Sequence, residues 1–265
     1  FFVCGMNDND LRAQAITEFR GFIPEKNILF SKQLQKVNRR SATGLSPALV
    51  IVDESHYASF RSSQVDKFLR NIDNPELLVL SVSATAMAEL AAGANGNATF
   101  GQVYLRPGDG YYSLQELFSR DLIRQSVDIT KDPDQFVDLV AAEYEYQRDH
   151  GDSKYNIVRL PNQWYYKDLE DDIHAMDLDI NFINHHTCTG INISDFNNYI
   201  RDRPERCTII WIYGSLRAGK QLDTTHIGFV HDTASSSPDV IAQSLMGRVL
   251  GYHKSANYVR CYTDI

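Results

Sequence analysis

The sequence lacks several features that would assign it to a specialised class of protein. Its 265 residues include only 4 cysteines, none in a C-x-x-C pair, which argues against a disulfide framework and favours reduced thiols in a cytosol-like compartment. No apolar run has the length of a membrane span, and the first residues do not have the pattern of a signal peptide. We therefore expect a cytoplasmic protein without a membrane partner.

Charge and composition set further limits. Lys and Arg number 26 against 34 Asp and Glu, and the formal net charge of −8 is not that of a protein that coats nucleic acid by bulk electrostatics. Any contact with nucleic acid must therefore come from local basic surface. A hydrophobic fraction of 43% and a charged fraction of 23% are typical of a soluble globular protein, and the length allows two domains of ordinary size.

The most informative stretch is Ala48–His56, which reads A-L-V-I-V-D-E-S-H. Its unbroken apolar run is typical of a strand that is covered on both faces in the middle of a parallel sheet. Asp53 and Glu54 then stand at the carboxyl edge, where open α/β sheets bind ligands. One carboxylate could hold magnesium while its neighbour orients or deprotonates an attacking water. The same pair could also cap a helix or occupy a solvated turn.

Strands and helices alternate twice along the chain. Strands are predicted at 1–5, 27–30, 48–53, 76–83, 155–160, 178–184, 207–213, 226–231 and 258–262, and helices at 11–19, 63–71, 86–92, 136–147, 162–176 and 239–249. This alternation predicts an α/β fold of two domains, each with a mainly parallel sheet flanked by helices. The domains cover residues 1–105 and 128–265, and the turn-rich start of 106–127 marks that segment as the connection.

A second motif competes as the chemical centre. Gly214–Gln221 matches the phosphate-binding loop G-x-x-x-x-G-K-[S/T] except at its last position, and it follows a predicted strand. In such a loop the backbone amides wrap the phosphates and Lys220 would reach their oxygens. However, Gln221 replaces the hydroxyl residue that ligates magnesium, and residues 222–230 are rich in β-forming residues instead of opening a helix.

Taken together, several stretches resemble the core of superfamily 2 helicases and translocases of the DEAD/DEAH-box type, which has two RecA-like domains. In the first domain, Cys4–Gln14 is similar to motif Ia, Val50–His56 to the DEAH-type motif II and Ser83–Thr85 to motif III. In the second domain, Arg217–Asp223 falls at the position of motif V, and Gln243–Tyr252 resembles motif VI. The similarity is greatest to phage and large-virus helicases and to Z1-type proteins, and it rests on the order and spacing of the motifs.

The resemblance implies an ATP-dependent helicase or translocase, of viral or phage type, with ATP and magnesium bound between the domains. Asp53 would position the magnesium, Glu54 would act on the attacking water, and Arg248 would stabilise charge on the transferred phosphoryl group. The partner would be nucleic acid, DNA rather than RNA, with room for flanking domains or partner proteins. The other implied site residues contact the nucleotide (Gln243, Gly219, Asp223, Gly247) or couple the two sites (His56, Ser83, Thr85), and the candidates for binding nucleic acid are Arg39, Arg40 and Arg217.

The chain departs from the family pattern in three ways. No phosphate-binding loop stands upstream of motif Ia, Gly251 stands where many relatives have a second arginine, and Gln243 is one residue further from Gly247 than usual. Because Phe1–Gly5 resembles the inside of a strand, we expect a preceding segment to carry the loop. The alternative is a degenerate, non-hydrolysing module that binds nucleic acid or serves in assembly. A third hypothesis is a different NTPase built on Gly214–Lys220.

Four further groups carry weaker hypotheses. The histidines at 185–186 and Cys188 could ligate a metal, but no second cluster completes four ligands. The aromatic runs at 164–166 and 111–112 are interpreted as packing residues, with base stacking as the alternative. Four basic residues could contact phosphates or form a solvated charged face: Lys32, Lys36, Arg39 and Arg40.

Overall fold

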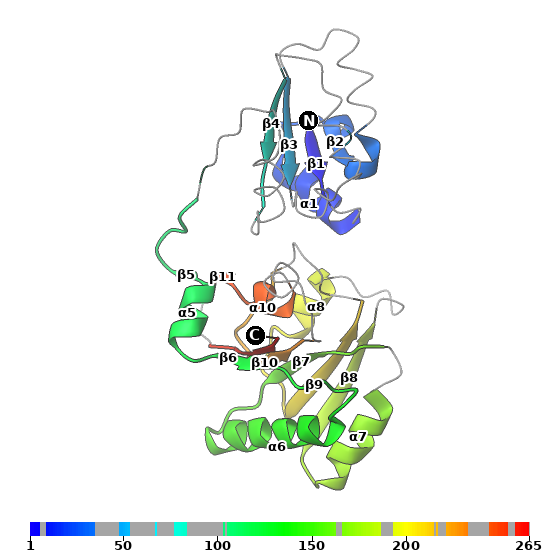
Figure 1. Cartoon of the computed structure of the whole chain (residues 1–265), viewed down its shortest axis with the longest axis vertical. Coiled ribbons are helices and arrows are strands. Elements are labelled where there is room, and N and C mark those ends of the chain that lie inside the picture. The colour runs from blue at the N-terminus through cyan, green and yellow to red at the C-terminus, as the bar shows by residue number, and fades with distance from the viewer. Residues whose placement is uncertain are drawn as a thin grey trace. The chain divides into compact units, whose positions relative to one another are not determined.

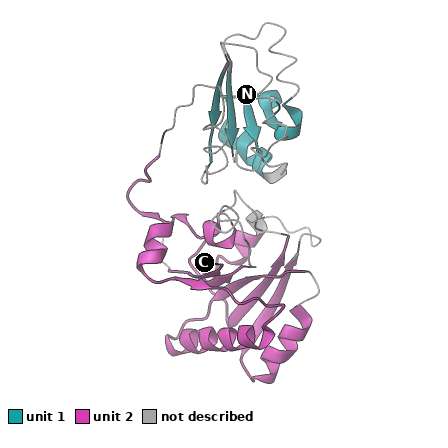
Figure 2. Cartoon of the chain, in the orientation of Figure 1, with its two compact units in different colours: residues 1–104 teal, residues 105–265 magenta. Residues whose placement is uncertain are grey.

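The computed structural model contains two compact units, unit 1 of residues 1–104 and unit 2 of residues 105–265 (Figure 1, Figure 2). The structure describes residues 1–5, 9–34, 48–53, 67, 77–83, 103, 105–162, 166–186, 193–214, 216, 221–232, 244–253 and 258–264. The helices predicted at 63–71 and 86–92 lie outside the described residues, apart from Lys67, which is helical.

Unit 1 contains a four-stranded parallel sheet in the order β2-β1-β3-β4. Its strands are β1 (Phe2–Cys4), β2 (Ile28–Phe30), β3 (Ala48–Asp53) and β4 (Leu77–Ser81). Between β1 and β2 the chain forms helix α1 (Asn9–Glu18), and the short 3-10 helices η1 (Glu25–Asn27) and η2 (Ser31–Gln33) flank β2. The acidic strand predicted from the sequence is therefore an inner strand of this sheet.

Alternation along β3 explains why the strand is apolar on both faces. Val50 and Val52 belong to the core cluster on one face of the sheet. Ile51 packs on the other face, in the cluster that includes Ala15 of α1. Successive side chains of a strand point to opposite faces, so an unbroken apolar run fills both. Asp53, the first polar residue of the run, ends the strand.

Unit 2 contains a six-stranded parallel sheet in the order β6-β12-β10-β7-β9-β8. Its strands are β6 (Ile123–Gln125), β7 (Tyr155–Arg159), β8 (Ile180–His186), β9 (Cys207–Tyr213), β10 (Ile227–His231) and β12 (Arg260–Thr263). Its described helices are α5 (Leu114–Ser119), α6 (Pro133–Asp149), α7 (Tyr166–Ala175), α8 (Ile193–Tyr199) and α10 (Leu245–Arg248). Within the described ranges, no helix combines the length and apolar character needed to cross a membrane.

Helices cover both faces of the unit 2 sheet (Figure 1). On one face, Phe136 of α6 and the buried side of α7 pack against Trp211 of β9. On the other face, Phe196 of α8 and Leu245 of α10 join the cluster that contains Ile210 of β9. The predicted α/β class, with parallel sheets flanked by helices, is confirmed.

The segment 106–127, expected as a connection, contains regular structure. Its α5 helix begins after Ser113, whose Oγ accepts a hydrogen bond from Glu116 N (3.2 Å). Its β6 strand is the edge of the large sheet and pairs with β12. Its β5 strand (Tyr111–Tyr112) pairs antiparallel with β11 (Gly251–Tyr252). Helix α8 is a further element that the sequence analysis did not predict.

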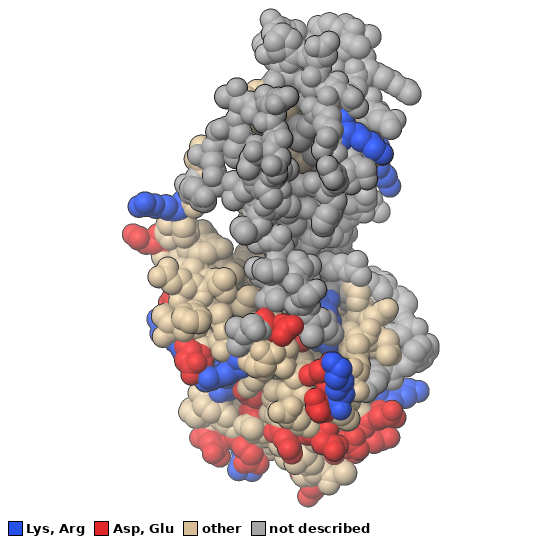
Figure 3. Space-filling view, viewed as in Figure 1, with Lys and Arg blue, Asp and Glu red and all other residues tan. Residues whose placement is uncertain are grey.

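The outer surface of α6 and α7 is acidic. Figure 3 shows acidic side chains gathered over these two helices. The exposed acidic residues are Asp134, Asp138 and Asp149 of α6 and Asp168, Asp171 and Asp172 of α7. Because nucleic-acid affinity depends on cationic contacts with phosphates, this surface is unfavourable for nucleic acid.

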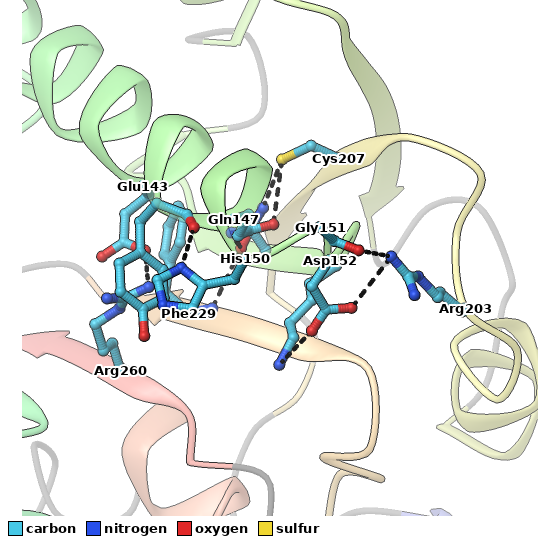
Figure 4. Close-up of polar contacts among 12 residues, drawn as sticks. Glu143, Gln147, His150, Gly151, Asp152, Arg203, Cys207, Phe229 and Arg260 are labelled. Atoms are coloured by element: carbon cyan, nitrogen blue, oxygen red, sulfur yellow. Dashed lines mark hydrogen bonds and ion pairs between the residues drawn. The ribbon is translucent and has the colours of Figure 1, made fainter.

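A buried polar network lies where α6 meets the sheet (Figure 4). Gln147 Nε2 donates to Asn156 Oδ1 (3.0 Å), which also accepts from Phe229 N (3.2 Å) where the register of β10 against β7 shifts. The side-chain amide thus satisfies a backbone N–H at the irregular point of the ladder. A Cβ added at Gly228 would lie 2.6 Å from Asn156 Oδ1, so a larger residue would displace this amide.

Candidate functional site at the sheet edges

The carboxyl ends of three strands meet at one edge of the unit 1 sheet. Gly5 N, just after β1, donates to Asp53 O (2.8 Å), and Val82 N, just after β4, donates to Val52 O (2.8 Å). These bonds hold Asp53 between the ends of β1 and β4, and Ser83 follows directly on Val82. Asp53 and Ser83 are both partly buried. The predicted magnesium-binding aspartate and the first residue of predicted motif III therefore share this edge.

Asp53 fits a role in holding magnesium. In sites that also bind phosphates, Mg²⁺ uses only one or two protein carboxylates, so a single aspartate at the sheet edge is sufficient. Within the described ranges, no group of three or more His, Cys, Asp or Glu is arranged to hold a metal ion without such a substrate. The other residues predicted for this site or for nucleic acid in unit 1 lie outside the described residues: Glu54, His56, Thr85, Arg39 and Arg40.

Arg248, the predicted phosphate-contacting arginine, ends helix α10 in unit 2 and directly follows Gly247. The residue is only 8% exposed, and its Nε donates to Ser244 O (3.3 Å) one turn earlier. Its carbonyl oxygen accepts a hydrogen bond from Leu222 N (2.9 Å). This bond ties the predicted motif VI to the end of the predicted motif V. Arg217, Gly219 and Gln243 lie outside the described residues.

A second contact joins the same two segments. Gln221 Nε2 donates to Leu250 O (3.4 Å), beside Gly251, whose φ is +133°. A Cβ on Gly251 would lie 2.2 Å from Gln221 Nε2, and L-residues rarely adopt this backbone conformation. The glycine that departs from the family's second arginine therefore has a local structural reason.

Asp223, predicted to contact the nucleotide, lies in a turn that its own side chain stabilises. Asp223 Oδ1 accepts hydrogen bonds from Thr225 N (3.0 Å) and Thr225 Oγ1 (2.6 Å). Burial alone would raise the pKa of Asp223, but the bonds from Thr225 outweigh it and lower that pKa. Asn197 of α8 clamps the same segment, accepting from Asp223 N (3.1 Å) and donating to Gln221 O (3.1 Å). The sequence analysis missed Asn197 because its helix was not predicted.

An ion pair at the carboxyl ends of two strands of the unit 2 sheet was not predicted from the sequence. Arg159, the last residue of β7, donates from Nε to Oδ1 of Asp232, which directly follows β10 (2.7 Å). Asp232 Oδ2 accepts from Leu245 N (2.8 Å), and Arg159 Nη2 donates to Leu216 O (3.3 Å). The available signal was weaker than the acidic pair that identified Asp53: a single charged residue at the carboxyl end of each of two strands.

The structure weighs against the phosphate-binding-loop hypothesis for Gly214–Gln221. Such a loop opens a helix whose first amides face the phosphates. None of the described residues 221–226 is helical, and β10 begins at Ile227. Lys220 lies outside the described residues.

The weaker candidates are placed as follows. His185 is buried and its ring lies 4.8 Å from that of Phe196, whereas Cys188 lies outside the described residues. Tyr112 is buried in the core of unit 2, in keeping with a packing role, and its burial raises its pKa. Tyr166 packs against the core formed with α6 and α7. Lys32 lies over the ring of Phe30 (5.4 Å), and 164–165 and Lys36 lie outside the described residues.

Comparison with known proteins supports the fold. No model of a protein family matches the chain. An uncharacterised protein, L594 of Acanthamoeba polyphaga mimivirus, is 30% identical over 236 residues, which are 82% of this chain and 56% of that protein. The chain therefore spans little more than half the length of this relative.

Two solved structures align over the whole chain. One is S. cerevisiae Dbp5 bound to RNA and ADP BeF3, with a TM-score of 0.50, 12% identity and 71% of that chain covered. The other is the ATP-dependent Type ISP restriction-modification enzyme LlaBIII bound to DNA, with a TM-score of 0.52, 11% identity and 22% coverage. At these identities the similarity establishes the fold alone. The chain has the fold of two RecA-like units.

Proposed function

We propose that this chain is the core of an ATP-dependent helicase or translocase that acts on nucleic acid, DNA in preference to RNA. The observation that carries the proposal is the junction of two segments of unit 2, the hydrogen bond from Leu222 N to Arg248 O. The junction joins two segments predicted as helicase motifs, on a fold that Dbp5 and LlaBIII share. Asp53, at the carboxyl edge of the unit 1 sheet, adds the expected acidic group.

In this proposal both units act on one ATP molecule. Asp53 would hold magnesium, which when bound would neutralise charge on the phosphate oxygens. Glu54 would accept a proton from the water that attacks the terminal phosphorus as ADP leaves. Arg248 would stabilise the charge on the transferred group, because its planar guanidinium matches phosphate oxygens. The remaining proposed contacts to the nucleotide are Gln243, Gly219, Asp223 and Gly247.

Arg248 must change its contacts to perform this role. Its side chain is buried and bonds to Ser244 O of its own helix. We expect an inward position, as observed, and an outward position that bound nucleotide favours through its additional charge contacts. The cost of leaving the inward position would be offset only when a phosphate is present.

Hydrolysis also requires a phosphate-binding loop, which we propose lies in residues that precede Phe1. The upstream coding sequence tests this directly. A G-x-x-x-x-G-K-[S/T] motif there supports the enzyme, whereas a native start at Phe1 supports a module that cannot hydrolyse ATP.

Nucleic acid would be held by local basic residues, since the net charge of −8 gives no general attraction. The proposed contacts are Arg39, Arg40 and Arg217, and His56, Ser83 and Thr85 would couple this site to the nucleotide. The acidic surface of α6 and α7 is not part of the proposed binding path. We propose that the protein acts in the cytoplasm, of the host cell if it is viral.

The test is Glu54→Gln in the intact protein. It should keep ATP binding and lose nucleic-acid-stimulated hydrolysis, because the amide cannot accept the proton of the attacking water. Glu145→Gln, on α6, is the matched control and should leave hydrolysis unchanged. Hydrolysis by Glu54→Gln at the wild-type rate would show that Glu54 is not the base.

The alternative is a non-hydrolysing module that binds nucleic acid or serves in assembly. The buried position of Arg248 favours it. Binding of labelled single-stranded DNA with no phosphate release from ATP, in the intact wild-type protein, would support this alternative and contradict the enzyme.

A further inference from the structure

The geometry points to Arg159 and Asp232 as a positioning pair. The pair connects helix α10, which carries Arg248, to the loop that follows β9. This inference rests on the proposed function and adds two residues that no motif contains. Neither residue is proposed to touch ATP. They act through the backbone of two other segments, Leu245 at the start of α10 and Leu216 in the loop after β9.

Each member of the pair bonds both to its partner and to the backbone of a second segment. Arg159 Nε bonds to Asp232 Oδ1 (2.7 Å), and Arg159 Nη2 reaches Leu216 O (3.3 Å). Asp232 uses its second oxygen for Leu245 N (2.8 Å). The side chains are 13% and 5% exposed, respectively. Because both strands belong to the sheet, the pair extends a rigid framework to the two segments.

The bonds form a closed circuit through the predicted site. From Arg159 the circuit passes to Leu216, along the chain to Leu222, across the bond to Arg248, along α10 to Leu245 and back through Asp232. Loss of the ion pair would remove the support that Arg159 and Asp232 give each other in holding the loop and the amino end of α10. The circuit therefore couples the two motif segments at a second point besides the bond between Leu222 and Arg248.

Both segments need this external support. Helix α10 has only four residues, and helices this short are unstable without tertiary contacts. Leu216 has a φ of +52°, a backbone conformation that is uncommon for residues other than glycine and costs free energy. Each segment would relax without its partner on the sheet, so the position of Arg248 depends on the pair.

Unit 2 offers a matched control. Arg260 Nη2 lies 2.7 Å from Glu143 Oε2, and these side chains are 20% and 5% exposed. Charge, geometry and burial thus resemble those of the first pair. The further described contacts of this pair lie instead in the packing between α6 and the sheet (Figure 4): Arg260 lies over the ring of Tyr146, and Glu143 Oε1 accepts a hydrogen bond from the hydroxyl of Tyr262.

The experiment measures two quantities in the intact protein: amide hydrogen exchange in residues 244–249 and steady-state ATP hydrolysis. Arg159→Leu should speed exchange in 244–249 while leaving α6 protected. It should lower kcat by about a hundredfold, the cost of an ångström-scale misplacement, with KM for ATP little changed. Arg159→Lys should restore part of kcat, and Arg159→Leu should cause no further loss in an Arg248→Ala background.

The control variant Arg260→Leu should not speed exchange in 244–249 selectively. Two results would overturn the positioning role. One is equally fast amide exchange in residues 244–249 for Arg159→Leu and Arg260→Leu, and the other is additive losses of kcat when Arg159→Leu is combined with Arg248→Ala. If Arg159→Leu does not fold, Asp232→Asn carries the same expectations. An inactive wild-type protein in which only the Arg159 or Asp232 variant speeds this exchange would contradict the proposed function and leave the positioning intact.

Discussion

Two arginine–carboxylate pairs lie in unit 2, and they differ in what their remaining atoms bind. The edge pair, Arg159 with Asp232, bonds to the backbone of one loop and of the first residue of α10 at the carboxyl end of the sheet. The core pair, Arg260 with Glu143, contacts the ring of Tyr146 and the hydroxyl of Tyr262 where α6 packs on the sheet. The same kind of ion pair thus holds backbone segments in one place and takes part in the packing of a helix on the sheet in the other.

The difference teaches that burial and ion pairing alone do not identify a functional group. Burial raises the pKa of Glu143, although the bond from Tyr262 and the charge of Arg260 oppose the rise. A perturbed carboxyl in a cleft is often a functional candidate, but this one lies in a packed layer. Location at the carboxyl ends of the strands is the better guide in this fold.

The largest expected effect is on the rate of ATP hydrolysis, which should depend on the carboxyl end of the sheet and not on the core pair. Arg248→Ala should reduce ATP hydrolysis by about a thousandfold or more if it stabilises the transferred phosphoryl group. Arg260→Leu should leave the rate per folded molecule nearly unchanged, since the core pair touches neither motif segment. Phosphate release corrected for the folded fraction measures both, and a loss of only a few-fold in Arg248→Ala would count against the assigned role.

Breaking the edge pair should also destabilise unit 2. Asp232→Ala leaves Arg159 without its carboxylate and Leu245 N without its acceptor, and removing one partner of a buried pair typically costs about 3–5 kcal/mol. Urea unfolding measures the loss. Glu143→Ala is the comparison, and we expect a smaller loss because Arg260 keeps its contact with the ring of Tyr146. The opposite order would mean that the edge pair is the less important one for folding.

A third experiment tests the packed layer alone. Gly228→Ala would bring a Cβ to 2.6 Å from Asn156 Oδ1 and 2.7 Å from Gln147 Nε2, and overpacking of this kind typically costs about 1–3 kcal/mol. Activity per folded molecule should not change. Adding Gln147→Ala should recover part of the stability by making room, and a simple sum of the two losses would contradict this explanation.

A fourth experiment tests a pH dependence from His231, which lies beside Asp232 and whose ring centroid lies 6.2 Å from that of Tyr262 in a stacked arrangement. Burial lowers the pKa of His231 to about 4, against the opposing charge of Asp232. The unfolded histidine, with a pKa of about 6.5, therefore binds a proton first. Its contribution to stability is complete above that pH and is lost as the pH falls towards 4, by at most about 1.4 kcal/mol per pH unit.

His231→Gln is the variant for this measurement, because its side-chain oxygen can still accept the bond from Val127 N that Nε2 now accepts (3.2 Å). Glu143 acts in the opposite direction: its raised pKa adds stability as the pH falls. Since Glu143 is common to both proteins, the difference between wild type and variant isolates His231. Parallel stability curves between pH 7 and pH 4 would contradict the buried, neutral state.

The fold could be predicted from the sequence where local pattern and tertiary structure agree. The run 207–213 is almost continuously apolar because the first six of its residues are buried on both faces of the sheet, and this signal needs no tertiary information. The β5–β11 ribbon is two residues long in each strand and joins positions 139 apart, Tyr112 with Gly251. No local pattern specifies such a pairing.

The same limit applies to the site. Asp53 could be predicted because it and Glu54 form an acidic pair directly after an apolar run. Arg159 and Asp232 are instead single charged residues at the ends of their strands. Their importance appears only when β7 and β10 lie side by side and bring the two charges together. Gly251 looked like a lost arginine until its backbone conformation and its contact with Gln221 were known.

The most direct test of the central claim is the rate of phosphate release from ATP by the intact wild-type protein, measured against increasing single-stranded DNA and, separately, RNA. We predict magnesium-dependent release that rises to a plateau with DNA and responds less to RNA. Release that never exceeds the protein-free blank, at DNA concentrations that saturate binding, would contradict an ATP-dependent helicase or translocase.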